Sequence, residues 1–288
     1  MHRTVAFLSA VVLTTLSFTA AGFAAQPDAF NFTVERGRSA DQVQLSLRDD
    51  RAGHHSNWSQ SFAVAELRGF RIGGAGPLSF AIIREAGRFD CSGQAGGSSA
   101  NGECRFAPDP GFAGFLASHG IARPTRDQAY ALAMSNVGRG HVEALAAFHY
   151  PNPTVDQLVA MGIHGATPAF IRDLAASGYR LRSADDLVTF RIHGVDGAYI
   201  RAIAAGDPKL RGIPADDLVA FRIHGVTPRY IEQLAALGYR GLGADDLVQM
   251  RIFAVTPDFI RSGEGGGAAR IPVAELVQMR IMGWRRAR

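Results

Sequence analysis

The C-terminal half of the sequence repeats two kinds of side chain that can bind charged groups or metal ions. A row of guanidinium groups can bind an acidic partner, and imidazoles can ligate a metal. The competing interpretation is structural, because a cation at the C-terminus of its own helix offsets the helix dipole and pairs with a neighbouring carboxylate. We favour the structural role and keep a binding face as a hypothesis for Arg191, Arg222, Arg251, Arg280, His164, His193 and His224.

The histidines do not form a metal-ligand pattern. Other copies of the repeat carry Phe253, Met282 and Ser135 at the same position, and none of the three histidines has a nearby Cys or a second His four residues on. Replacement by Phe and Met suits a packed position at a helix end. The adjacent His54 and His55 point in different directions and have no third ligand, which favours a polar turn. We therefore predict no metal site.

No motif of a common catalytic site occurs in the sequence. It lacks Gly-x-Ser-x-Gly, Gly-x-x-x-x-Gly-Lys and His-Glu-x-x-His. The paired carboxylates Asp185 and Asp186 recur in later copies of the repeat, which indicates helix starts more than a single acid–base site. We predict a non-enzymatic protein with no catalytic residue and no cofactor. An enzyme with its site in the N-terminal region is the alternative.

The two cysteines predict one disulfide in a hairpin. If the segments around Cys91 and Cys104 pair, the register that sets these residues opposite each other also sets Phe89 opposite Phe106. We expect the residues from Gly93 to Gly102 to form the intervening turn. A redox or metal role is the alternative, but the sequence has no Cys-x-x-Cys.

Residues 28–108 are predicted to form a β-rich domain. Residues 43–48 alternate with period two, residues 80–84 do so in part, and residues 57–62 resemble a shorter strand. Breaks are expected at residues 73–77 and 95–102, where Gly, Ser and Pro gather. A small antiparallel sheet is the expected result.

Residues 109–288 are dominated by an internal repeat. Residues 183–195 match residues 214–226, and further copies bring the starting positions to 125, 154, 183, 214, 243 and 272, spaced by 29, 29, 31, 29 and 29 residues. Each unit has room for two short helices. Asp185 falls in a first turn, Gly194 follows a last turn, and Thr227-Pro228 begins the second helix of its unit.

Apolar residues within a unit predict the buried stripes of these helices. Leu218 with Phe221 and Val219 with Ile223 lie three and four residues apart, so all four are expected on one apolar stripe. Helices of about ten residues are marginal alone, which predicts that units stack as an α-solenoid. The expected shared core is a Leu-Val pair that never varies, at positions 158–159, 187–188, 218–219, 247–248 and 276–277. The last unit is incomplete, and Trp284 is expected in a cap core or as an exposed docking residue.

A helix-hairpin-helix that binds DNA is a second hypothesis. Residues 223–234 resemble that motif, but Thr227 replaces its second glycine and Pro228 lacks an N–H for a phosphate. The chain also has 30 basic against 26 acidic residues, a formal charge of only +4. Nucleic acid is therefore an unfavoured partner, although DNA or another polyanion stays open.

The N-terminus resembles an export signal. Arg3 precedes an apolar stretch from Val5 to Phe18, and Ala24 closes a group of small residues, so residues 1–24 are predicted to be a signal peptide. A retained membrane anchor is the alternative. No later segment has the roughly 18 to 20 apolar residues of a membrane span, so the mature chain is expected in the periplasm or outside the cell of a bacterium.

The helical repeats contain the motifs Arg-Ile-His-Gly-Val-Thr-Pro, Leu-Gly-Tyr and Ala-Asp-Asp-Leu-Val. Together with residues 84–90 and 106–110, these motifs resemble the extracytoplasmic extensions of bacterial membrane metallopeptidases of the beta-lactam-sensor class. The resemblance covers roughly residues 40–283 and implies a periplasmic binding or sensing role. The peptidase motif of that family is absent. The combined expectation is an α+β protein, a small antiparallel β-domain before a helical repeat array, that binds another envelope protein. The sequence leaves the oligomeric state open.

Overall fold

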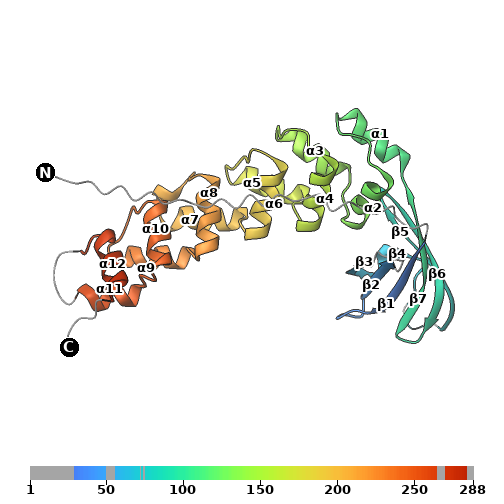
Figure 1. Cartoon of the computed structure of the whole chain (residues 1–288), viewed down its shortest axis with the longest axis horizontal. Helices are drawn as coiled ribbons and strands as arrows, with labels where there is room; N and C mark the ends of the chain where they lie inside the picture. The colour runs from blue at the N-terminus through green and yellow to red at the C-terminus, as the bar shows by residue number, and fades with distance from the viewer. Residues whose placement is uncertain (1–28, 50–55, 72, 74, 265–269, 284–288) are drawn as a thin grey trace.

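The computed structural model describes residues 29–49, 56–71, 73, 75–264 and 270–283. Within them it contains a curled seven-stranded antiparallel sheet followed by twelve α-helices, which extend away from the sheet (Figure 1). The α+β class predicted from the sequence is confirmed. The predicted signal peptide, the His54-His55 pair and Trp284 lie outside the described residues.

The sheet is antiparallel throughout and has the order β3-β2-β1-β7-β6-β5-β4. A short 3-10 helix, η1 (Val64–Glu66), joins β3 to β4. The strands are β1 (Phe30–Arg36), β2 (Gln42–Asp49), β3 (Ser56–Ala63), β4 (Leu67–Arg68), β5 (Ala75–Arg84), β6 (Gly87–Gly96) and β7 (Ser99–Pro108).

One face of the sheet forms the N-terminal part of the core. In β1, Phe30, Phe32 and Val34 are buried, while Asn31 and Thr33 between them are exposed. Side chains alternate between the faces of a strand, so this pattern separates an apolar interior from a polar outer face.

The predicted cysteine hairpin is confirmed. Cys91 of β6 lies opposite Cys104 of β7, Phe89 lies opposite Phe106, and the two cysteines form a disulfide. All four side chains are buried on the interior face.

The turn in this hairpin is much shorter than the sequence predicts. β6 continues to Gly96 and β7 begins at Ser99, so Gly93 and Gly102 are paired strand residues and not parts of a loop. A Cβ on Gly93 would collide with the carbonyl oxygen of Asn101. The glycines therefore permit a close approach of two strands, a role that resembles a loop signal in the sequence.

The break expected at residues 73–77 is also wrong in part, because Pro77 lies inside β5 and pairs with Gln94 of β6. On its other side, β5 pairs with β4 only at Ala81 and Ile82. Pro77 therefore lies in a part of β5 that pairs with β6 alone, and proline is tolerated on strands with one unpaired edge.

The helices follow β7 directly. They are α1 (Pro110–Ser118), α2 (Arg126–Met134), α3 (Arg139–Ala147), α4 (Val155–His164), α5 (Pro168–Ala176), α6 (Ala184–His193), α7 (Gly197–Gly206), α8 (Ala215–His224), α9 (Pro228–Ala236), α10 (Ala244–Ile252), α11 (Pro257–Glu264) and α12 (Val273–Ile281), with a 3-10 helix η2 (Pro208–Leu210) after α7.

Each helix packs on the helix two places further along the chain. The even-numbered helices contact one another in the series α2, α4, α6, α8, α10 and α12, and the odd-numbered helices do so from α1 to α11. Each even-numbered helix from α4 onward buries one leucine to 1% exposure or less, namely Leu158, Leu187, Leu218, Leu247 and Leu276. The valine after it is buried in α4, α6 and α12 and half-buried in α8 and α10.

The ends of the helices follow from local sequence. The N-cap residues of the even-numbered helices are Thr125, Thr154, Ser183, Pro214, Gly243 and Pro272. After the last turn, Gly165, Gly194 and Gly225 adopt left-handed backbone, which glycine takes without steric strain. Asn136 and Ala254 adopt the same conformation in two other units.

α2 covers the open end of the sheet. The ring of Tyr130 contacts the rings of Phe30, Phe89 and Phe106, with centroids 4.8 to 5.6 Å apart. Beside it, Arg139 at the start of α3 forms an ion pair with Glu85 at 2.8 Å. The sheet and the helices therefore share one continuous apolar core.

Candidate binding surface

The four repeated arginines each reach back to the preceding even-numbered helix. The Nε of Arg191 donates to the carbonyl oxygen of His164 at 3.4 Å, and that of Arg222 donates to the carbonyl oxygen of Gly194 at 2.8 Å. Arg251 and Arg280 repeat this on the carbonyl oxygens of His224, at 3.3 Å, and Phe253, at 3.1 Å. These carbonyls lie at a helix C-terminus, where they lack partners within the helix and the negative end of the dipole attracts a cation.

Each arginine also stacks on an aromatic ring of the preceding odd-numbered helix. The guanidinium carbon lies 3.9 to 5.1 Å from the ring centroid in the pairs Arg191–Phe170, Arg222–Tyr199, Arg251–Tyr230 and Arg280–Phe259. Such cation–π contacts contribute about 0.5–1 kcal/mol at exposed sites and more when desolvated. The arginines are therefore contacts between neighbouring units of the chain.

One unit lacks both members of this pair. Gly162 of α4 stands where the later units have arginine, and His141 of α3 stands where they have Phe or Tyr. A Cβ on Gly162 would lie 2.6 Å from the carbonyl oxygen of Ser135 and 2.7 Å from Val137, so the neighbouring unit packs directly on the bare helix. The joint loss of both side chains supports a paired structural role for the arginine and the ring.

Tyrosines form a second set of contacts, in the opposite direction. The hydroxyl groups of Tyr199 and Tyr230 donate to the carbonyl oxygens of Val226 and Val255 in the next unit, both at 2.7 Å. Burial raises the pKa of each tyrosine to about 12, although the arginine stacked on the ring lowers it. The hydroxyl groups therefore stay protonated donors.

The structural interpretation of the arginines from the sequence needs correction in its details. It placed each cation in the last turn of its own helix beside a carboxylate. The position in the last turn is correct, but the partners are the last carbonyls of the preceding even-numbered helix. Within the described residues, no carboxylate forms an ion pair with Arg191, Arg222, Arg251 or Arg280. The signal that could have found the ring partners is an aromatic residue 21 positions before Arg191, Arg251 and Arg280. For Arg222 the aromatic residue, Tyr199, lies 23 positions earlier.

The three candidate histidines lie next to these contacts. The side chains of His164 and His193 are partly exposed and that of His224 is exposed. No group of three or more metal-ligating side chains with suitable placement occurs among the described residues. The histidines therefore line the same edge of the helices as the arginines without forming a ligand set.

In the even-numbered helices from α4 to α12, the residue before the histidine position belongs to an exposed apolar row that the sequence reasoning missed. Between 52% and 67% of the surface of each of these residues is exposed. We call this set the isoleucine row, and it consists of Ile163, Ile192, Ile223, Ile252 and Ile281.

Placing Ile223 on the buried stripe of its helix was wrong. Leu218 and Phe221 are buried, but Ile223 is 58% exposed. Ile223 follows Phe221 by two residues, which is about 200° around an α-helix, so it faces away from the core. Ile223 lies four residues after Val219, and this helical spacing led to the wrong prediction that Ile223 is buried.

The other end of the same helices is acidic. Asp156, Asp185, Asp216 and Asp245 are exposed in the first turns of α4, α6, α8 and α10. The isoleucine row and the arginines lie in the last turns. α6, α8 and α10 therefore have a negative end and an apolar, positive end, whereas α4 has an acidic end and an apolar end without the arginine.

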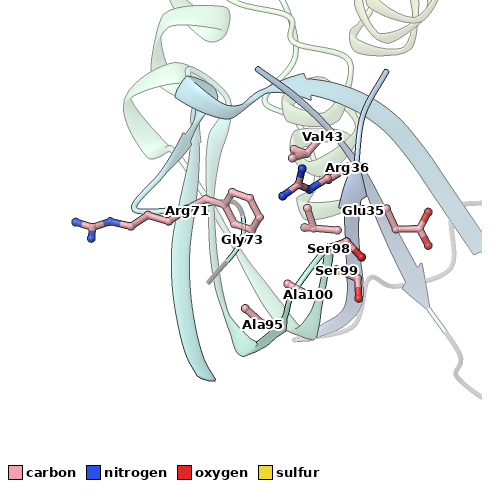
Figure 2. Close-up of a pocket in the computed structure, with 12 residues that line it drawn as sticks. Glu35, Arg36, Val43, Arg71, Gly73, Ala95, Ser98, Ser99 and Ala100 are labelled. Carbon is pink, nitrogen blue, oxygen red and sulfur yellow. The ribbon is translucent and has the colours of Figure 1, made fainter. Parts of the chain in front are cut away.

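The alternative from the sequence, an enzyme with its site in the N-terminal region, would need a pocket in the β-domain, and a small pocket lies in the curl of the sheet. It is lined by residues of β1, β2, the segment between β4 and β5, and the β6–β7 hairpin, and has a volume of about 10 Å³, enough for about one water molecule. Figure 2 shows the charged groups of Glu35 and Arg71 pointing away from it on opposite sides. The pocket lining brings no acid–base pair together.

A larger cavity of about 170 Å³ lies where α1 and α2 meet the sheet. It is lined mainly by Pro, Ala and Phe112. The carboxylate of Asp109 accepts a hydrogen bond from the N–H of Phe112 at 2.7 Å, and Arg126 donates to the carbonyl oxygen of Phe106 at 3.1 Å. Both polar groups thus hold the junction between helix and sheet.

The sequence matches no known family model and no curated protein. Among the described residues, none of the helices combines the length and apolar character that crossing a bilayer requires.

Proposed function

We propose that this chain is an exported, non-enzymatic binding protein that contacts another component of the bacterial cell envelope through its helical repeats. The observation that carries the proposal is the isoleucine row, because five large apolar side chains are at least half exposed on helices whose leucines are buried. Contiguous exposed apolar surface is typical of interaction sites. The family resemblance implied another envelope protein as the partner and a role in envelope sensing; the surface itself supports contact with an envelope component, whether a protein or the membrane.

The helices would present this surface as an α-solenoid of 29-residue units. Support comes from the contacts between helices two places apart and from the arginine and tyrosine contacts that join successive units. Because these contacts run in both directions along the chain, they would hold each short helix that is marginal alone.

Export to the periplasm or beyond is supported by the buried disulfide. Disulfides form and persist in oxidising compartments, and Cys91–Cys104 is the single cysteine pair of the chain. Sequencing the N-terminus of protein recovered from the periplasm tests the predicted signal peptide. An unprocessed N-terminus would favour the retained anchor.

Site-specific photo-cross-linking in the envelope tests the binding function. A benzophenone amino acid at Ile223 is expected to form an adduct with an envelope protein or lipid. The matched control is Asp216, an exposed position in the first turn of the same helix. Equal adducts from both positions, or none from Ile223, would refute the proposed surface.

A polyanion is the second candidate, favoured by the four arginines that have no carboxylate partner among the described residues. Binding of heparin that weakens steeply with salt and is lost when the arginines are replaced would support it. Retention that depends on Ile223 but not on salt would exclude it.

A further inference from the structure

We propose that the isoleucine row and the arginines beside it dock on an anionic lipid surface. This inference rests on the proposed binding function and names the envelope component that the row contacts. Four observations support it: the exposed apolar side chains of the row, the repeated use of isoleucine, the positive charge beside the row, and the increase in exposed apolar residues toward the C-terminus.

The apolar component is a line of projecting side chains. Each isoleucine lies in the last turn of its helix and is at least half exposed. Neither pocket of the preceding section includes a residue of the row. A lipid interface accepts projecting aliphatic side chains without a complementary set of cavities, and burying their apolar surface stabilises the bound state.

The residue type is the same along the row, whereas neighbouring exposed positions differ from helix to helix. The exposed residue one turn earlier is Thr189 in α6 but Gln249 in α10 and Gln278 in α12, whereas the row keeps isoleucine in every even-numbered helix from α4 to α12. In α2 the same position is the buried Met134, so the row begins at α4. A folded protein partner presents a different surface to each unit and would favour different residues along the array. A lipid surface presents the same chemistry to every unit, which favours one repeated apolar residue.

The charge beside the row is positive. Arg191, Arg222 and Arg280 are exposed and Arg251 is partly exposed, and none forms an ion pair with a described carboxylate. The carbonyl and ring contacts leave the formal charge of each guanidinium in place. Asp156, Asp185, Asp216 and Asp245 lie at the opposite helix ends, so an anionic surface against the row meets the arginines and not these four carboxylates.

The apolar character increases toward the C-terminus. The residue after the isoleucine is histidine in α4, α6 and α8, but it is Phe253 after α10 and Met282 after α12, which are 37% and 71% exposed. The region from α8 to α12 is therefore the expected centre of the contact.

Vesicle sedimentation tests the proposal on protein recovered from the periplasm, with its N-terminus determined. Wild-type protein is expected to sediment with vesicles of phosphatidylglycerol and phosphatidylcholine, less so at high salt, and poorly with phosphatidylcholine alone. Replacing Ile223, Ile252 and Ile281 together by Ser is expected to weaken partitioning by on the order of tenfold. Ile83→Ser, on the outer face of the sheet, is the control and should partition like wild type.

Circular dichroism checks that each variant is folded. If the triple variant is unfolded, the single variants Ile223→Ser and Ile252→Ser replace it, and each is expected to show a smaller loss of vesicle partitioning. No sedimentation of wild type, equal sedimentation with both vesicle types, or a folded triple variant that partitions normally overturns the inference. A protein cross-linked at Ile223 without vesicle binding would keep the proposed binding function and exclude the lipid surface. Absence of both results would overturn both proposals.

Discussion

Arg222 offers the sharpest test of how successive units are joined, because its guanidinium carbon lies 3.9 Å from the ring centroid of Tyr199 and its Nε donates to the carbonyl of Gly194 at 2.8 Å. Arg222→Met keeps most of the aliphatic stem and removes the charge and the donors. A hydrogen bond from a charged group contributes about 1.5 kcal/mol at the low end of its range, and an exposed cation–π contact adds about 0.5–1 kcal/mol. The free energy of unfolding is therefore expected to fall by about 2 kcal/mol.

Urea denaturation followed by circular dichroism measures this loss. Arg229→Met is the matched control, because Arg229 is an exposed arginine for which the structure records no carbonyl or ring contact. In a double-mutant cycle, Tyr199→Leu and Arg222→Met should be coupled by about 0.5–1 kcal/mol. A loss in Arg222→Met no larger than in Arg229→Met, or additive effects in the cycle, would show that Arg222 is an ordinary solvated cation.

Three further predictions concern stability. Ala254→Gly should raise the free energy of unfolding by about 0.5–1 kcal/mol, because relief of left-handed strain exceeds the added entropy of the unfolded chain; a loss in urea denaturation would contradict this. Reducing the disulfide Cys91–Cys104, or replacing both cysteines by Ser, should lower the free energy of unfolding by about 3 kcal/mol, and dithiothreitol should not change the stability of the double variant. Burial lowers the pKa of His141 in the folded chain below that of a free histidine. As pH falls below about 6.5, His141 therefore binds a proton more readily in the unfolded chain than in the folded chain, and the free energy of unfolding should decrease. His141→Phe should reduce that pH dependence of the urea midpoint, and an identical slope in both proteins would exclude His141 as its source.

The parts of the fold that depend on neighbours in sequence could be predicted from sequence. Period-two alternation and a cysteine pair were enough to set Cys91 opposite Cys104 and Phe89 opposite Phe106. Asp185 in a first turn and the Thr227-Pro228 pair similarly marked helix starts, and the structure begins α6 at Ala184 and α9 at Pro228. By contrast, glycine in a strand and glycine in a turn look alike in sequence, so Gly93 and Gly102 were assigned to a loop.

The candidate surface was predicted only in part. The repeated arginines were identified, but their partners were not, because a side chain of this length can reach its own helix or the next unit. Ile223 was assigned to the core for a related reason, since a helix of ten residues shows apolar spacing on more than one face. Its exposure depends on which face the adjacent helices cover.

By itself, the sequence determined the disulfide hairpin and the helix starts, because each depends on contacts that neighbouring residues or a single strand pairing can specify. Only the tertiary structure decided the strand order, the packing of Tyr130 against the open end of the sheet, and the exposure of the isoleucine row. These features arise from the packing of segments distant in the chain, and that packing determines which apolar side chains are buried and which are left in contact with water.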